Sequence, residues 1–187
     1  MKEQDLDSKI SNDSSLIVYP QKQEIKLSSS ESEEPISSNS SIDCTSLQNL
    51  LAKKQWQQAN QETATLLLKA ANQERRNWLE RNDVENISCR DLLIINQHWQ
   101  DYSQGHFGFI SQLNIWQNLE LQNYQQFGYQ VGWYHQRKWI SIKHLDFTSA
   151  APKGHLPAIS WWFGHAIWGL KVLFSRLNSC LMEEINT

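Results

Sequence analysis

The chain of 187 residues contains few cysteines, prolines and glycines, with three, four and seven of them respectively. The cysteines, at positions 44, 89 and 180, form no CxxC pair and are too few for a disulfide framework. We therefore predict free thiols and a reducing compartment, with Cys89 packed as a small apolar side chain. The longest apolar stretch, residues 161–174, is shorter than the ~20 residues that a membrane span needs.

The chain also has no large excess of positive or negative charge. It contains 17 Lys and Arg residues and 20 Asp and Glu residues, which gives a net charge of −3. That balance excludes a histone-like or polybasic nucleic-acid binder. Basic and aromatic residues do mix between Trp133 and Trp139, a pattern that can stack on bases. Because the chain has so little positive charge to attract a phosphate backbone, no nucleic-acid partner is expected.

The sequence motifs of common enzymes are absent, since the chain has no P-loop, no GxSxG and no HExxH sequence. Its six histidines are eight to 29 residues apart, and none lie at the i, i+4 spacing of a helical metal site. We predict a protein without catalytic activity and without catalytic or metal-ligating residues. His155 is expected to stabilise a loop by hydrogen bonding rather than to ligate a metal.

The serines and tryptophans divide the chain into a tail and a domain. Residues 1–45 contain 12 serines, four lysines and nine acidic residues, whereas all nine tryptophans come later. Such a polar segment cannot bury enough apolar surface to offset the entropy of ordering, so we predict a disordered acidic tail over 1–45. Its acidic start lacks the basic region of a secretory or transit presequence. The folded domain is expected at 46–182, with a frayed end at 183–187.

Apolar residues at helical spacing predict an all-α domain. A first short helix is expected to open at Leu50, and a second to carry the apolar stripe of residues 56–71. Ser88 followed by Asp91 matches a helix N-cap, and Gly105 matches a left-handed cap at the far end of that helix. Later stripes lie at 109–116, 124–131 and 167–181.

Two further features of the second half are predicted from its apolar pattern. Short apolar segments at 131–134 and 139–142 predict one small hairpin. The last stripe, 167–181, is expected to form a helix that closes the core. Peripheral contact of this helix with a membrane surface is the alternative, because tryptophans accompany it and suit an interface.

The segment around the predicted hairpin has the composition of a porphyrin site. A porphyrin is a flat apolar disc with carboxylates at one edge, so it needs aromatic and aliphatic walls and cations at the rim. The expected walls are Trp133, Trp139, Ile142, Leu145 and Phe147. The expected rim cations are Arg137, Lys138 and Lys143. The alternative interpretation is that these tryptophans only pack a core.

Several short sequence motifs, the words of a family pattern, also occur in the domain in a distinctive order. They include Val84-Glu85-Asn86, Phe107-Gly108-Phe109, Val131-Gly132-Trp133 and the loop of residues 151–157, APKGHLP. In these words and their spacing, from about Leu47 to Cys180, the chain resembles the genomes-uncoupled-four (GUN4-like) family. The resemblance implies a compact multi-helix domain shaped like a cupped hand, with long ordered loops.

The resemblance further implies a function. It implies binding of protoporphyrin IX or Mg-protoporphyrin IX and stimulation of magnesium chelatase, through the porphyrin-binding large subunit of that enzyme, in chlorophyll biosynthesis. It places the binding surface between loops at 72–87 and 132–160. To the residues above it adds Leu79, Ile87, Phe107, Phe109 and Leu156. A haem sensor or a protein-interaction module of the same fold is the alternative.

The same resemblance sets the expected location. A protein of the chlorophyll pathway without a targeting segment is expected in the plastid (chloroplast) stroma, or alternatively in the cytoplasm of a cyanobacterium. The abundance of Asn, Ile, Lys and Ser indicates an AT-rich coding genome, which favours the plastid.

Overall fold

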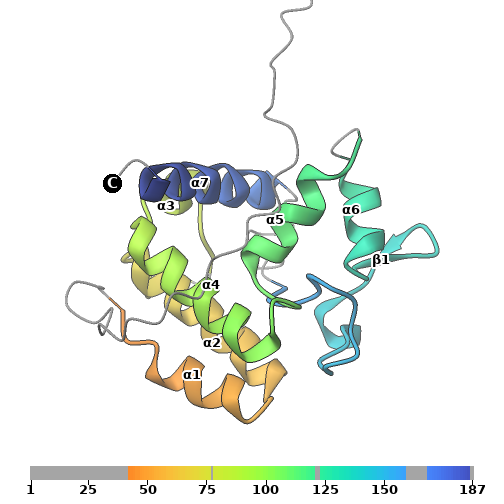
Figure 1. Cartoon of the computed structure of the whole chain (residues 1–187), viewed down its shortest axis with the longest axis horizontal. Helices are drawn as coiled ribbons and strands as arrows, with labels where there is room; N and C mark the ends of the chain where they lie inside the picture. The colour runs from red at the N-terminus through yellow and green to blue at the C-terminus, as the bar shows by residue number, and fades with distance from the viewer. Residues whose placement is uncertain (1–41, 77, 121–122, 159–167, 186–187) are drawn as a thin grey trace, which may run out of the picture. The chain divides into compact units, whose positions relative to one another are not determined.

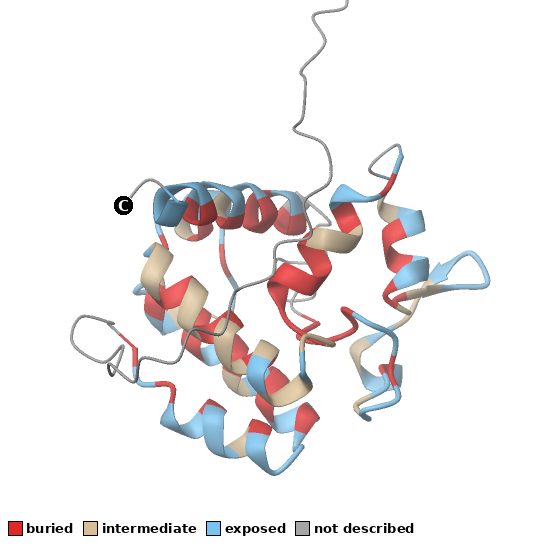
Figure 2. Ribbon diagram, in the orientation of Figure 1, coloured by how far each residue is buried: buried red, intermediate tan, exposed pale blue. Residues whose placement is uncertain are grey.

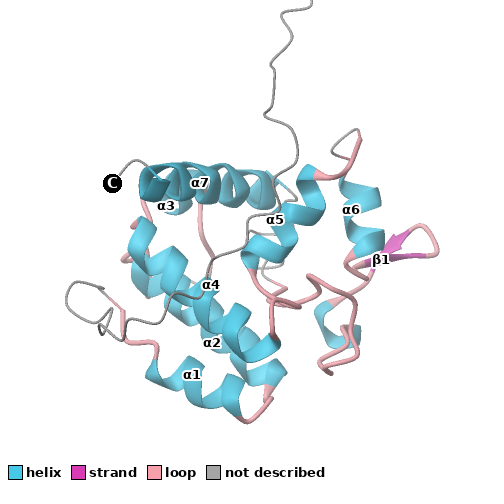
Figure 3. Cartoon of the chain, viewed as in Figure 1, coloured by secondary structure: helices cyan, strands magenta, loops and turns pink. Residues whose placement is uncertain are grey.

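The computed structural model describes residues 42–76, 78–120, 123–158 and 168–185. Within these ranges the chain is mainly helical, as predicted (Figure 1 and Figure 3). The helices are α1 (Thr45–Ala52), α2 (Trp56–Ala70), α3 (Arg81–Glu85), α4 (Cys89–Ser103), α5 (Phe109–Gln117), α6 (Tyr124–Gln130) and α7 (Trp168–Ile185). A small antiparallel sheet, β1 (Tyr134–His135) and β2 (Lys138–Trp139), and a 3₁₀ helix, η1 (Ile142–His144), follow α6.

The first helix starts earlier than predicted. Instead of opening at Leu50, α1 begins at Thr45 and ends at Ala52. The reason is that Leu47 and Leu51, one turn apart, are both buried, and the polar residues around Leu47 hide this short stripe in the sequence. The carboxylate of Asp43 accepts a hydrogen bond from the backbone N–H of Thr45 at 2.9 Å, at the point where the helix begins.

The two ends of the predicted domain also differ from the described structure. Ile42 and Cys44 are buried, although the predicted tail included them, and the rest of that tail, residues 1–41, lies outside the described residues. At the other end α7 continues to Ile185, beyond the predicted limit of 182, and residues 186–187 lie outside the described residues.

An aromatic cluster joins α2 to α4. The ring of Trp56 stacks on that of Trp99 at a centroid distance of 6.0 Å, and the ring of Phe107 meets Trp56 edge-on at 5.3 Å. The indole N–H of Trp99 donates to the hydroxyl of Thr63 at 2.9 Å, so this fully buried ring has its polar atom satisfied. Figure 2 shows the buried residues that run along these helices. The predicted stripe of α2 therefore forms part of the core.

Helix α4 begins as predicted, and its C-terminal cap, Gln104, lies one residue before the predicted cap. The hydroxyl of Ser88 accepts from the backbone N–H of Asp91 at 3.0 Å, which confirms the N-cap. At the other end the left-handed conformation starts at Gln104, with φ 54°, and continues at Gly105, with φ 73°. The backbone N–H of Gly105 donates to the carbonyl of Gln100 at 2.8 Å, which closes the helix.

The predicted last helix is present over residues 168–185, and only the first residue of the predicted stripe, Ile167, lies outside the described residues. Helix α7 packs against α3, α4 and α5. Its Phe174 ring contacts the rings of Trp116 and Phe127 at centroid distances of 6.0 and 5.7 Å, so it helps to close the core. In the part of the chain that is described, no helix has both the length and the apolar character to traverse a bilayer.

The prediction of three free thiols is wrong for two of them. Cys89 and Cys180 form a disulfide that joins the first residue of α4 to α7. Their separation of 91 residues hides the pairing in the sequence, since only the docking of α7 on α4 brings them together. Cys44 is free and buried, and burial raises the pKa of its thiol to about 11, so that it stays protonated at neutral pH.

Candidate functional site

The predicted hairpin is present and carries three of the proposed ligand-contacting residues. Tyr134 pairs with Trp139 and His135 with Lys138. The two residues between the strands, Gln136 and Arg137, both have left-handed backbone conformations, with φ 47° and 63°. A two-residue turn of this kind matches the twist of a hairpin, and it places Arg137 at the tip with Lys138 beside it.

The indole of Trp139 occupies a space that a glycine provides. Its ring meets Tyr134 edge-on at a centroid distance of 5.2 Å and remains half-buried. A Cβ atom at Gly128 of α6 would lie only 2.6 Å from Cζ3 of that indole. Because only glycine permits this approach, α6 fixes where the hairpin lies against the domain.

The segment that follows the hairpin carries the other proposed surface residues. Lys143 lies in η1 and is exposed, as are Arg137 and Lys138. Ile142 and Phe147 are half-buried and pack against the core, with part of each side chain still accessible. The structure thus brings three exposed cations and three half-buried apolar side chains, counting Trp139, onto the hairpin and the segment directly after it.

The remaining six predicted contacts lie in the core. Their exposed fractions are 3% or less; they are Leu79, Ile87, Phe107, Phe109, Trp133 and Leu156. The indole N–H of Trp133 donates to the carbonyl of His155 at 2.8 Å, and its ring meets Phe127 edge-on. Direct contact between these six and a ligand stays a prediction; in this structure all six are buried, as is Leu145, the fifth expected wall residue.

Hydrogen bonds to buried side chains hold the loop of residues 151–158 in place. The two ring nitrogens of His155 bridge the loop to its neighbours, because Nε2 accepts from the backbone N–H of Asp146 at 3.1 Å and Nδ1 lies 2.6 Å from the carbonyl of Val131. Nδ1 therefore carries the proton and donates to that carbonyl. This confirms His155 as a loop-stabilising residue.

Two buried amides also hold this loop, and the sequence analysis missed both. The side-chain amide of Gln112 donates to the carbonyls of Gly154 and Pro157, each at 3.0 Å. The amide oxygen of Asn60 accepts from the backbone N–H of Ala158 at 2.6 Å. Both residues lie among apolar positions of their helices, so a polar residue inside an apolar stripe was the available signal.

The buried state of His155 predicts a pH dependence of stability. Burial lowers the pKa of this imidazole below its ordinary 6.5, so the folded chain holds it neutral. Below pH 6.5 the unfolded chain binds more protons than the folded chain, and the free energy of unfolding falls as the pH decreases. Protonation also removes the lone pair that accepts from Asp146. Urea denaturation at pH 8.0 and 5.5 measures the difference.

The matching variants assign this effect to one histidine. Burial also lowers the pKa of His98, so His98→Gln is the control and should remove only part of the pH dependence. His155→Gln should be less stable at pH 8.0 and should lose less stability on acidification than the original chain. An identical slope in all three proteins would contradict the assignment.

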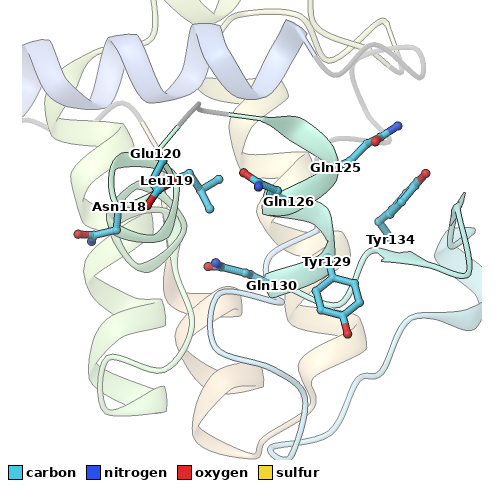
Figure 4. A pocket seen from close by; sticks show the side chains of 8 residues that line it. All are labelled: Asn118, Leu119, Glu120, Gln125, Gln126, Tyr129, Gln130 and Tyr134. Carbon is cyan, nitrogen blue, oxygen red and sulfur yellow. The ribbon is translucent and has the colours of Figure 1, made fainter.

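An open pocket of about 450 Å³ lies next to the hairpin, between the end of α5 and α6 (Figure 4). Its lining residues are Asn118, Leu119, Glu120, Gln125, Gln126, Tyr129, Gln130 and Tyr134. Four of these eight side chains are amides, and Leu119, Tyr129 and Tyr134 add apolar surface. Across the described ranges, no three His, Cys, Asp or Glu side chains gather in an arrangement that holds a metal ion.

The chain is similar to named proteins over much of this domain. It is 36% identical over 146 residues to the uncharacterized protein ycf53 of Porphyra purpurea, a match that covers 72% of this chain and 61% of the relative. It is 28% identical over 123 residues to the chloroplastic tetrapyrrole-binding protein of Arabidopsis thaliana, covering 59% of this chain and 46% of the relative. The matches thus span about half to three fifths of these relatives.

Two solved structures share the fold. The structure of GUN4 from Chlamydomonas reinhardtii matches with a TM-score of 0.61 and 31% identity, over 75% of this chain and 90% of the other. The ligand-free structure of Arabidopsis thaliana GUN4 matches with a TM-score of 0.64 and 23% identity, over 75% and 98%. The model of the family described as GUN4-like matches residues 37–176. This chain therefore belongs to the GUN4-like family.

Proposed function

We propose that this chain binds a tetrapyrrole on the surface made by its hairpin and the segment after it. The observation that carries the proposal is the grouping of three exposed cations beside half-buried apolar side chains. Trp139, Ile142 and Phe147 offer apolar surface to the disc, while Arg137, Lys138 and Lys143 offer positive charge to carboxylates at its edge. The Arabidopsis relative named as a tetrapyrrole-binding protein supports the same class of ligand.

The ligand that suits this surface is a porphyrin with free propionates, either protoporphyrin IX or Mg-protoporphyrin IX. The protein acts without catalysis of its own, and stimulates magnesium chelatase through the porphyrin-binding large subunit of that enzyme. Chlorophyll biosynthesis is then the process that it serves. The plastid stroma is the proposed location, which agrees with the chloroplastic relative.

Porphyrin titration tests this proposal. Adding protoporphyrin IX to the full chain is expected to quench tryptophan fluorescence in a saturable way at micromolar ligand. The variant Arg137→Ala/Lys138→Ala/Lys143→Ala should bind about tenfold more weakly, because up to three exposed ion pairs of about 0.2–1 kcal/mol each are lost. Its far-UV circular dichroism should be unchanged, since all three side chains are exposed.

A charge-matched control separates a local effect from one of net charge. Lys53, Lys69 and Lys171 are also exposed and lie in other parts of the chain, so their replacement by alanine removes the same charge elsewhere. This control should keep the affinity of the original chain. Equal weakening in both triple variants would argue against a rim at the hairpin, and absence of saturable quenching in the original chain would refute porphyrin binding itself.

The proposed stimulation of magnesium chelatase needs a separate measurement. Magnesium insertion by purified chelatase subunits should accelerate when this chain is added together with protoporphyrin IX. If the chain binds porphyrin but leaves the insertion rate unchanged, the function is that of a tetrapyrrole carrier or sensor instead.

A further inference from the structure

Two interactions attach the same short segment to α7, one near the middle of the helix and one a turn further on. The disulfide joins Cys89 to Cys180, and the guanidinium of Arg176 donates two hydrogen bonds to the carbonyl of Ile87, at 3.0 and 2.9 Å. Arg176 and Cys180 are four residues apart and therefore lie on one face of α7. The segment of residues 87–89, which links α3 to α4, is thus fixed to α7 at both of its ends.

The N-terminal half of α7 is attached differently. Phe174 packs between the rings of Trp116 and Phe127, and Leu170 and Leu173 are buried in the core. Apolar packing therefore holds the N-terminal half of α7 on the domain without a covalent bond. In the C-terminal half Leu177 and Leu181 are also buried, whereas Met182 and Ile185 near the end of the helix are exposed. The disulfide at Cys180 therefore joins α7 to α4 close to the point where the buried face of α7 ends.

The two cysteines of the disulfide differ in burial. Cys180 is fully buried, but Cys89 remains partly exposed. As the first residue of the 15-residue helix α4, Cys89 lies at the positive end of the helix dipole, which favours a thiolate there once the bond is broken. A disulfide whose reduced form is stabilised in this way is reduced more readily than a wholly buried one.

We propose that Cys89–Cys180 is a reversible redox link, opened by a dithiol reductant, that controls how firmly the C-terminal half of α7 is held on α3 and α4. The inference goes beyond the proposed ligand binding and does not depend on it. When the link is open, residues 177–185 separate transiently from the domain, while the first half of α7 stays packed on Trp116 and Phe127. Figure 1 shows α3 beside the part of α7 nearest the C-terminus.

The exchange proceeds in two steps. A thiolate of the reductant attacks the sulfur of Cys89, the Cys89–Cys180 bond breaks, and Cys180 leaves as a thiolate that takes up a proton. The reductant is now joined to Cys89 in a mixed disulfide. Its second thiol, as a thiolate, attacks the reductant's own sulfur in that bond, and Cys89 leaves as a thiolate. In total, two electrons and two protons pass from the reductant to Cys89 and Cys180, which become thiols. The reductant becomes a cyclic disulfide. An oxidised dithiol reverses the process.

The test uses the full chain without denaturant. Reduced dithiothreitol is expected to release two additional thiols, counted after acid quenching and alkylation, and oxidised dithiothreitol to remove them again. Hydrogen–deuterium exchange should then be faster in residues 177–185 of the reduced protein by at least about tenfold, with residues 168–174 unchanged. A disulfide that opens only in denaturant would overturn the proposal, as would reduction without a change in exchange at 177–185.

Two variants secure the interpretation. Cys180→Ser should show the fast exchange at 177–185 with and without dithiothreitol. Cys44→Ala removes the buried free thiol and keeps the link, so it should respond to dithiothreitol as the original chain does. If Cys180→Ser does not fold, the comparison of the oxidised and reduced forms of Cys44→Ala still decides the outcome. Loss of the response in Cys44→Ala would contradict the assignment to Cys89 and Cys180.

Discussion

Replacing Trp133 by alanine is expected to lower the free energy of unfolding by about 3–5 kcal/mol. The indole is fully buried, meets Phe127 edge-on at 5.7 Å, and donates from Nε1 to the carbonyl of His155 at 2.8 Å. Alanine leaves a large cavity and removes the hydrogen bond that this buried carbonyl accepts. Because domains are stable by only about 5–15 kcal/mol, this loss is a large part of the total. Urea denaturation followed by far-UV circular dichroism measures it.

Trp139→Ala is the matched control for Trp133→Ala. Trp139 is only half-buried, its main aromatic contact is Tyr134, and it lies in a two-residue strand. We expect its removal to cost no more than about 1–2 kcal/mol. The comparison distinguishes the tryptophan that supports the core from the one that faces the proposed ligand. Similar losses for both variants would contradict this division.

Replacing Gly108 by alanine is expected to cost about 3 kcal/mol. The backbone there has φ 115° and ψ 163°, a region that essentially only glycine occupies and that costs other residues about 1–3 kcal/mol. An added Cβ would lie 2.6 Å from Nε2 of Gln100 and 3.0 Å from Oδ1 of Asn96. Neither amide can move freely, because Gln100 donates to the carbonyl of Phe107 and Asn96 accepts from the N–H of Ile110, and each such bond is worth about 1 kcal/mol.

The neighbouring Gly105 provides the comparison for Gly108→Ala. Its φ of 73° is the common left-handed conformation, and a Cβ there would have its nearest neighbour, Oε1 of Gln100, at 3.5 Å. Gly105→Ala should therefore cost only about 1 kcal/mol. Thermal unfolding of both variants in one buffer measures the two losses. An equal effect would mean that the crowding around Gly108 contributes nothing.

Most helices were predictable because their signals are local, whereas the five-residue helix α3 was not predicted. The apolar stripe that begins at Trp56 and the cap formed by Ser88 and Asp91 depend on residues within one or two turns of each other. Helix α1 was placed late because only Leu47 and Leu51 mark its buried face. The disulfide was not predictable, since its cysteines meet only after α7 has docked on α4.

The proposed site was predictable in part for the same reason. Arg137, Lys138 and Trp139 are adjacent in the sequence, so any hairpin there presents them together. Composition does not distinguish an aromatic ring that faces solvent from one that faces the core. For this reason both Trp133 and Trp139 were expected as walls, although Trp133 lies inside the core. The loop-holding role of Gln112 was also hidden, because its partners lie more than 40 residues away.

The two-residue turn of the hairpin bears on how this protein responds to selection for heat resistance. Gln136 and Arg137 both hold left-handed backbone conformations that favour Asn and Gly, and side chains other than these cost about 1 kcal/mol at such positions. Random mutagenesis screened by survival at high temperature would therefore enrich an Asn-Gly tip. Such variants would gain stability and lose the guanidinium of Arg137, so thermal stability and the proposed ligand binding would favour different residues at position 137.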